Sequence, residues 1–288
     1  MGLAKLYVVA TPIGNLQDFS PRGIETLRQA DLIVAEDTRV TMKLCQVFDI
    51  HTRMTSCHRH NEESKGLRIA EQIAEENLTA ALTTDACTPC ISDPGNELVK
   101  ACLDRGVEVV PVPGCCAGIA AVSVSGADAR EFAFYGFLPR EKKDLREKLR
   151  QICGGPRVAV IHESPFRVAD LLEAMEEIMP QARLTVCCDL TKLHEKNRYG
   201  TPAEVLSDMK ADEKAEKGEY CVVADLHIVP LQEPEKTASE AELSLEARLT
   251  DRMRNGMSLR EAQEALVAEG KKKNAVKQAA LNLKKMFE

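Results

Sequence analysis

The sequence has no apolar run that approaches the roughly 20 residues a helix needs to cross a bilayer, and its start lacks the layout of a secretory signal peptide. Its net charge is −7, so attraction of nucleic acid to the whole surface is also not expected. Any nucleic-acid partner must therefore meet a local basic patch. With 44% hydrophobic and 29% charged residues among 288, the chain is long enough for two core-bearing domains and an appendage.

The glycine-rich loops of common nucleotide-binding folds are missing. No GxGxxG follows a predicted strand and no GxxxxGK[ST] occurs, which disfavours Rossmann-type and P-loop enzymes. A zinc site is not expected, because the chain has a single CxxC and no further ligands at a suitable spacing. The eleven cysteines are scattered through predicted strands and helices. This pattern is typical of a reduced, cytoplasmic protein and not of a disulfide framework.

Short apolar runs alternate with helical patterns along most of the chain. The predicted strands are 6–10, 32–35, 79–83, 107–110, 157–161, 184–187 and 220–223, and the predicted helices are 21–30, 39–48, 64–76, 93–105, 141–152 and 166–178. The alternation indicates an α/β fold with parallel or mostly parallel strands. Because the pattern restarts near Phe137, we predict one α/β domain at 1–136 and a second at 137–228.

The C-terminal part is predicted to be helical and basic. Residues 229–240 contain two prolines and no periodicity, which is typical of a linker, and 241–288 form the tail domain. Asn255-Gly256 predicts a helix end, and Ser258 with Glu261 forms a capping box that begins the next helix. A third helix follows. We interpret four lysines as an RNA-backbone contact, the alternative being a solvated charged surface: Lys271, Lys272, Lys273 and Lys277.

The segment 84–95 reads Thr-Asp-Ala-Cys-Thr-Pro-Cys-Ile-Ser-Asp-Pro-Gly and is the most informative of the chain. It follows a predicted strand, at the end where α/β sheets bind ligands. Ser92 or Asp93 is expected to cap the helix that follows, with Pro94 in its first turn. Cys87 and Cys90 form the CxxC, which is a reactive redox pair when it lies at a helix N-terminus. The alternative interpretation is a ligand-binding loop.

Seven further motifs accompany this segment. They are Ala-Thr-Pro-Ile-Gly-Asn-Leu at 10–16, Ala-Glu-Asp-Thr-Arg at 35–39, His-Arg-His-Asn-Glu at 58–62, Pro-Val-Pro-Gly at 111–114, Gly-Phe-Leu-Pro at 136–139, Glu-Ser-Pro with an arginine at 163–167, and Leu-Thr-Lys-Leu-His-Glu at 190–195. Their order resembles the ribosomal RNA small subunit methyltransferase I family of the tetrapyrrole methylase superfamily. The resemblance spans residues 5 to 228, and the tail is similar to the family's C-terminal helix-turn-helix.

The resemblance implies two α/β domains with S-adenosylmethionine in the cleft between them, and a homodimer. It also implies 2′-O-methylation of a cytidine ribose in 16S rRNA of the small ribosomal subunit. The cofactor-binding residues that it implies are Pro12, Gly14, Asn15, Thr84, Asp85, Ala86, Thr88, Pro113, Cys116, Ala117, Phe137 and Glu163. Two alternatives stay open: an RNA-binding protein of this fold with weakened or lost activity, and a methyltransferase that acts on a corrin or porphyrin ring.

A ribose hydroxyl is a poor nucleophile until its proton is removed, so the implied reaction needs a proton acceptor. The candidates are Glu36, Asp37, His60, Glu163 and Lys192. Arg39 and Arg167 are interpreted as phosphate anchors, because a guanidinium matches phosphate geometry and stays charged. Each candidate also has a purely structural interpretation. Glu36-Asp37 could cap the helix that starts near Arg39, His60 could be a surface-loop histidine, and Glu163 could mark a helix start.

The chain departs from the family pattern at several positions of the expected site. Glycine is expected at Cys87 and another small or apolar residue at Cys90, while Arg-Glu is usual where Cys188-Asp189 stands. If Cys87 has a positive φ, cysteine costs about 1–2 kcal/mol there. We expect these changes to affect activity more than fold.

Overall fold

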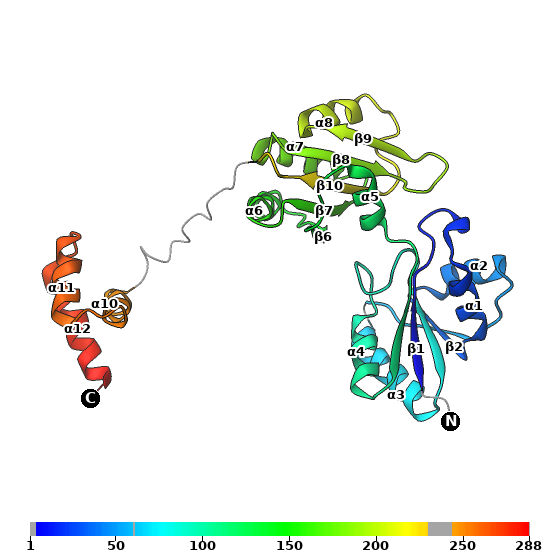
Figure 1. Ribbon diagram of the computed structural model, residues 1–288, viewed down its shortest axis with the longest axis horizontal. Coiled ribbons are helices and arrows are strands. Elements are labelled where there is room, and N and C mark those ends of the chain that lie inside the picture. The colour runs from blue at the N-terminus through cyan, green and yellow to red at the C-terminus, as the bar shows by residue number, and fades with distance from the viewer. Residues whose placement is uncertain (1–3, 60, 230–243, 288) are drawn as a thin grey trace. The chain divides into compact units, whose positions relative to one another are not determined.

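A computed structural model describes residues 4–59, 61–229 and 244–287 (Figure 1). The chain forms two compact units, Met1–Leu231 and Gln232–Glu288. His60, one of the candidate proton acceptors, and nearly all of the expected linker at 229–240 lie outside the described residues.

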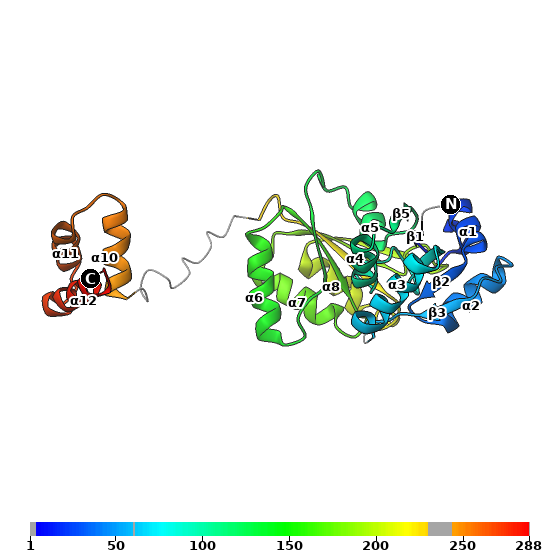
Figure 2. The ribbon, with the colours of Figure 1, turned by 90° about the horizontal axis from the view of Figure 1, so that it is seen from below.

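The first sheet is parallel throughout, in the order β3-β2-β4-β1-β5. Its strands are β1 (Lys5–Val9), β2 (Leu32–Ala35), β3 (Met54–Ser56), β4 (Thr79–Thr83) and β5 (Glu108–Val112). Helices cover both faces (Figure 2), which explains why the central strands β1, β2 and β4 are rich in apolar residues. The helices are α1 (Pro21–Gln29) and α2 (Thr38–Val47) on one face, and α3 (Leu67–Glu75) and α4 (Asn96–Asp104) on the other.

The second sheet is mixed, in the order β6-β7-β10-β8-β9, with only β6 and β7 parallel. Its strands are β6 (Ala133–Phe137), β7 (Val158–Glu163), β8 (Arg183–Cys188), β9 (Lys196–Gly200) and β10 (Tyr220–Asp225). Helix α5 (Ala117–Ser125) packs on one face, where Ala121 is fully buried. The other face is covered by α6 (Lys142–Cys153), α7 (Val168–Ile178) and α8 (Pro202–Lys210).

The passage from the first sheet to the second therefore lies between β5 and α5. The boundary expected after residue 136 falls within β6 instead. The sequence pattern placed it late because α5 was not recognised as a helix. Its sequence AGIAAVSVS contains mostly small apolar residues and no charged one, so it shows no polar face by which a helical period is detected.

Helix α4 begins differently from the expectation that Ser92 or Asp93 caps it. It starts at Asn96, after Gly95, and has no side-chain cap from the preceding residues. Instead Glu62, at the start of the single-turn helix η2 (Glu62–Gly66), accepts hydrogen bonds through Oε1 from the amides of Gly95 at 2.8 Å and Glu97 at 2.9 Å. The acceptor lies 33 residues from Gly95 in sequence, which a local pattern cannot reveal.

In its described residues, the second compact unit forms α10 (Leu245–Arg254), α11 (Leu259–Ala268) and α12 (Lys273–Phe287). Leu249, Leu266 and Val276 belong to its small core. The predicted helix end at Asn255-Gly256 and the capping box of Ser258 and Glu261 are both confirmed.

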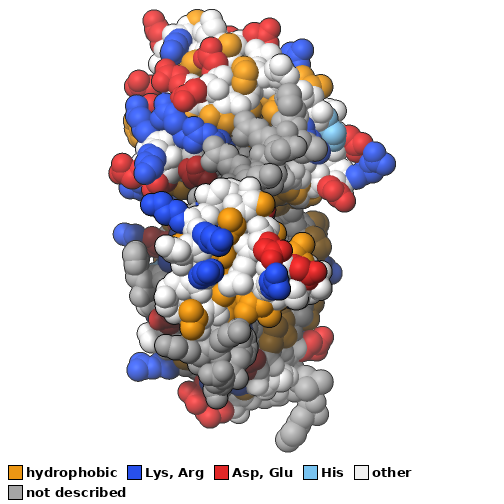
Figure 3. All heavy atoms as spheres, turned by 90° about the vertical axis from the view of Figure 1, so that its left-hand side faces the viewer, with side chains coloured by type: hydrophobic (Ala, Val, Ile, Leu, Met, Phe, Trp, Pro, Cys, Tyr) orange, Lys and Arg blue, Asp and Glu red, His pale blue; other side chains and the backbone are white. Residues whose placement is uncertain are grey.

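Acidic and basic side chains are interspersed with apolar ones on the face drawn in Figure 3. In the described ranges no helix is both long and apolar enough to cross a membrane.

Candidate functional site

A cleft of about 430 Å³ lies in the first compact unit. One wall consists of the loops that follow β2 and β4 at the carboxyl end of the first sheet. The other wall comes from the second sheet, through the ends of β6 and β7, the loop after β8 and the start of β10. The size is that of a small-molecule site. The position agrees with the rule that α/β sheets bind ligands beyond their strands' carboxyl ends.

Three carboxylates meet in the first wall: Glu36 after β2, and Asp85 and Asp93 between β4 and α4. Burial raises the pKa of each of them, and repulsion adds to the rise, from Asp93 and Asp85 on Glu36 and from Asp85 on Asp93. The amide of Asp37 donates to Asp85 Oδ1 at 3.2 Å, which ties the two loops together. A positively charged ligand would relieve this repulsion, so the wall favours a cation.

The second wall is formed by aromatic rings and a buried carboxylate. Phe137 is 62% exposed and meets the ring of His162 edge-on at 5.9 Å. Burial lowers the pKa of His162, so its imidazole is neutral at pH 7. Glu163 is 2% exposed. Its Oε1 accepts from the amide of Ser164 at 2.7 Å, and its Oε2 lies 3.3 Å from the Arg167 guanidinium.

Two loops of the first sheet are joined by backbone pairing. The amide of Thr11 donates to the Cys87 carbonyl at 2.9 Å, and that of Cys87 donates to the Thr11 carbonyl at 3.2 Å. Cys87 and Cys90 have φ of 75° and 68°. The positive φ considered for Cys87 is therefore confirmed, and cysteine stands there in the left-handed region that favours glycine.

The CxxC does not form a thiol pair. The Cys87 side chain lines the cleft. Cys90 instead packs beside the core of the first sheet. Its Sγ and a methyl of Leu82 lie so close to Gly95 that each would be only 2.8 Å from a Cβ added to this glycine. Because the two side chains face different surroundings, the redox interpretation of Cys87 with Cys90 is not supported.

Lys192 connects the second sheet with the loop after β1. Its Nζ lies 2.7 Å from Asp189 Oδ1 and 3.1 Å from Glu219 Oε2. Burial lowers its pKa, but the hydrogen bonds to Asp189 and Glu219 prevail and raise it. The lysine stem passes close to Gly14, where an added Cβ would lie 2.4 Å from Lys192 Cγ. Lys192 is therefore a protonated cation, held in place on both sides.

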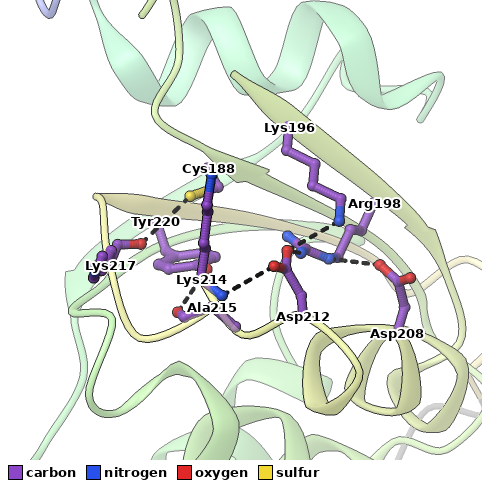
Figure 4. A network of polar contacts seen from close by, with 9 residues as sticks. All are labelled: Cys188, Lys196, Arg198, Asp208, Asp212, Lys214, Ala215, Lys217 and Tyr220. Atoms are coloured by element: carbon purple, nitrogen blue, oxygen red, sulfur yellow. Dashed lines mark hydrogen bonds and ion pairs between the residues drawn. The ribbon is translucent and has the colours of Figure 1, made fainter. Parts of the chain in front are cut away.

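A polar network supports the segment that leads into the cleft (Figure 4). Arg198 of β9 is 5% exposed and pairs with Asp208 at 2.6 Å and with Asp212. Beyond Asp212, the Tyr220 hydroxyl donates to the Ala215 carbonyl at 2.8 Å. The network fixes the turn that brings Glu219 and Tyr220 to the cleft wall.

Five of the expected cofactor-binding residues line the cleft: Asp85, Ala86, Ala117, Phe137 and Glu163. Three others, Pro12, Gly14 and Thr84, line a separate hollow of about 320 Å³ beside α2. Asn15 caps the short helix Leu16–Asp18 through a 3.0 Å hydrogen bond from Gln17.

The remaining three lie where the loops meet. Thr88 donates to the Cys115 carbonyl at 2.8 Å, and Cys116 is the N-cap residue of α5, three residues after Pro113.

The other expected site residues have structural partners. Asp37 caps α2 through its 2.8 Å bond from the Arg39 amide, and the hydrogen bond of the Arg39 side chain lowers the pKa of Asp37 to about 2. Arg39 is otherwise largely exposed. Arg167 donates to the carbonyls of Leu138 and Pro139 at 3.2 and 2.9 Å. The helix-capping interpretation of Asp37 is therefore confirmed.

Sequence reasoning missed several lining residues, among them Asp93, His162, Glu219 and Tyr220. Asp93 lies within the 84–95 segment and His162 directly precedes the motif that starts at Glu163, so their place at strand and loop ends was a usable signal. Tyr220 begins β10, an antiparallel strand in the middle of the second sheet, and Glu219 directly precedes it, so only the strand order brings them to the cleft. Within the described residues, no group of three or more His, Cys, Asp or Glu side chains could hold a metal ion.

Comparison with known proteins agrees with this arrangement. The sequence profile of the Tetrapyrrole (Corrin/Porphyrin) Methylases matches residues 5–206. A cobalt precorrin-4 methyltransferase of cobalamin biosynthesis has a similar structure, with a TM-score of 0.54 at 17% identity, covering 79% of this chain and 97% of that chain. This likeness concerns the fold alone.

Two relatives are both named ribosomal RNA small subunit methyltransferase I. The protein from Halalkalibacterium halodurans is 43% identical over 220 residues, which are 76% of this chain and 75% of that protein. The protein from Escherichia coli O157:H7 is 38% identical over 281 residues, 96% of this chain and 94% of that protein. The chain therefore belongs to the ribosomal RNA small subunit methyltransferase I family, within the tetrapyrrole methylases.

Proposed function

We propose that this protein transfers a methyl group from S-adenosylmethionine to the ribose 2′-hydroxyl of a cytidine in 16S rRNA. The observation that carries the proposal is the acidic cleft wall in a chain of this family, since Glu36, Asp85 and Asp93 converge where a cationic ligand would bind. When bound, S-adenosylmethionine supplies a methyl group on a positively charged sulfonium.

The residues of the cleft fit this cofactor. The three carboxylates balance a positive charge, and Phe137 offers an exposed ring face. Ser92 Oγ and His162 Nε2 are buried and make no hydrogen bond within the described part of the chain. They are therefore available to polar groups of a ligand, and unpaired they would be costly to bury.

Among the candidate proton acceptors we favour Glu36. It lines the cleft, and its raised pKa makes its carboxylate more basic than an exposed glutamate. Asp37 is held by Arg39, with its pKa lowered to about 2, and is a weak base. Lys192 is protonated and cannot accept a proton, so its proposed role is to position the loops on both sides of it.

The direct test is transfer of radiolabelled methyl groups to small ribosomal subunits that lack this modification. Glu36→Gln should lower kcat by about 10²–10⁴ if Glu36 is the general base. Glu71→Gln, an exposed glutamate of α3, is the matched control and should keep full activity. Absence of incorporation with folded protein that binds the cofactor would overturn the proposed function. A normal kcat for Glu36→Gln would overturn only its role.

The alternative of a corrin or porphyrin methyltransferase is less well supported. It rests on fold likeness to an enzyme at 17% identity, whereas the relatives at 38–43% identity carry the ribosomal RNA name. The alternative of an RNA-binding protein that no longer binds S-adenosylmethionine is separated by calorimetry, because micromolar binding of the cofactor would remove it.

We further infer a cytoplasmic homodimer. The eleven cysteines are all free, which suits a reducing compartment. Helix α2 exposes Val40, Met42 and Val47 by 38–60%, an apolar surface that a second copy would cover. Light scattering of the wild type should give the mass of two chains, and Met42→Lys with Val47→Lys should give one. A monomeric wild type would contradict the dimer.

A further inference from the structure

Two thiols from different loops meet beside the cleft. Cys87 follows β4, Cys116 precedes α5, and their side chains share a hydrogen bond. The loops that carry them are tied together, because Thr88 Oγ1 donates to the Cys115 carbonyl at 2.8 Å. Cys87 is fixed on its other side by its backbone pairing with Thr11. The fold therefore holds as neighbours two cysteines that are far apart in the sequence.

The surroundings of Cys116 favour its thiolate. The hydrogen bond with Cys87 lowers the pKa of Cys116, and the amides of Ile119 and Gly118 in the first turn of α5 lower it further. The same thiol–thiol bond, together with burial, raises the pKa of Cys87, so Cys87 keeps its proton. The thiolate is the nucleophilic form of cysteine. Most other thiols are inert by comparison, since burial raises the pKa of Cys45, Cys57 and Cys102 to about 11.

The pair is also accessible from solvent. Cys87 lines the open cleft, and Cys87 and Cys116 are both partly exposed. Cys90, the sequence neighbour that a CxxC would use, packs beside the core of the first sheet. Cys221 lies near Cys116 but is only 3% exposed. Cys116 is therefore the best placed partner for Cys87.

We propose that Cys87 and Cys116 are an oxidative modification site, where hydrogen peroxide converts the two thiols into a disulfide across the wall of the cleft. The Cys116 thiolate attacks one peroxide oxygen and forms an S–O bond, the O–O bond breaks with loss of hydroxide, and Cys116 becomes a sulfenic acid. The Cys87 sulfur then attacks the sulfenic sulfur, the S–O bond breaks, and the thiol proton leaves with the oxygen as water. The two cysteines lose two electrons in total and the peroxide gains them.

The disulfide should weaken cofactor binding, and only this consequence rests on the proposed function. A disulfide draws the sulfurs to about 2.05 Å, much closer than two hydrogen-bonded thiols. The loop with Asp85 and the start of α5 with Ala117, both in the cleft wall, must move together. Because both segments line the cleft, their movement changes the shape of the site, and we expect at least about a tenfold loss in affinity for S-adenosylmethionine.

Peptide mapping tests the site itself. The reduced full chain is treated with one equivalent of hydrogen peroxide, alkylated under denaturing conditions and digested without reductant. We expect one cross-linked peptide that joins Cys87 to Cys116, absent from Cys116→Ser and present in Cys90→Ser and Cys115→Ser. A bond from Cys87 to Cys90 or to Cys221, or complete alkylation of both cysteines, would overturn the proposal. The wild-type result needs no variant to fold.

Calorimetry with S-adenosylmethionine tests the consequence. Affinity should fall at least tenfold in the oxidised wild type, return after dithiothreitol, and stay unchanged by peroxide in Cys87→Gly. Equal affinity of the disulfide form and the reduced form for S-adenosylmethionine would overturn the proposal that the disulfide weakens cofactor binding. No binding to the reduced protein would instead contradict the proposed function, and the peptide map would still decide whether the modification site exists.

Discussion

Cys87 shows how one residue can fit a fold poorly and still be tolerated. Its φ of 75° lies in the left-handed region, which costs a residue with a Cβ about 1–2 kcal/mol. Glycine removes this cost but loses more chain entropy on folding, about 0.5–1 kcal/mol. We predict that Cys87→Gly raises the free energy of unfolding by about 0.5–1 kcal/mol, measured by urea denaturation.

Cys90→Gly is the matched control for this prediction. Cys90 has a similar φ of 68° but packs beside the apolar core, so its replacement also removes buried contacts and should bring no gain. Equal stabilisation by both substitutions would show that backbone strain alone determines the change in unfolding free energy. A lower unfolding free energy for Cys87→Gly would contradict the strain argument.

Asp93 illustrates the conflict between stability and binding in the acidic wall. Burial and repulsion from Asp85 raise its pKa, so the folded state retains a proton that the unfolded state releases. The free energy of unfolding therefore falls as the pH rises from the pKa of Asp93 in the unfolded state through its higher pKa in the folded state. We predict that Asp93→Asn raises the melting temperature at pH 7 and flattens this pH dependence.

The same substitution should weaken binding of S-adenosylmethionine, because one of three carboxylates that face the cation is lost. Asp104→Asn, on the exposed end of α4, is the charge-matched control and should change neither quantity. A lower melting temperature for Asp93→Asn would contradict the prediction, because it would mean that the Asp93 carboxylate stabilises the protein without cofactor.

At the scale of elements, Glu62 connects a distant motif to the cofactor loop. Its Oε1 accepts from the amides of Gly95 and Glu97, and it is 6% exposed. Glu62→Ala leaves two amides without an acceptor and should cost about 2–4 kcal/mol in unfolding free energy. Glu62→Gln keeps an acceptor oxygen and should cost less. Both should raise KM for the cofactor more than they lower kcat, and equal stability of the two variants would contradict the capping role.

The elements also show what local pattern can and cannot predict. Strands β1, β2 and β4 and helices α1 and α2 were predicted within one or two residues, because each combines an apolar run with a clear start or end. Helix α5, strand β9 and the true start of α4 were missed. The sequence of α5 lacks a polar face, β9 pairs through a largely polar segment, and the start of α4 depends on Glu62. These features depend on contacts with distant parts of the chain, so no short stretch of sequence reveals them.

At the scale of the whole molecule, the order of motifs predicted the family while individual residues remained uncertain. Glu36, Asp85, Phe137 and Glu163 were predicted and do line the cleft. Glu219 and Tyr220 were not, because they reach the cleft only through the strand order of the second sheet. Sheet order and side-chain pairing across the cleft are properties of the folded chain, and motif spacing does not encode them.

The helical tail has its own core and exposed lysines, so its role in RNA binding can be tested separately from cofactor binding. We predict that replacing Lys271, Lys272, Lys273 and Lys277 by alanine weakens RNA binding and lowers the slope of log K against log salt by about 3, since each phosphate contact contributes about 0.7–0.9. Cofactor affinity should not change, because the cleft lies in the other compact unit. Lys100→Ala, on the exposed surface of α4, is the control. An unchanged salt slope would mean that these lysines form only a solvated surface, and a loss of cofactor affinity would contradict the independence of the two units.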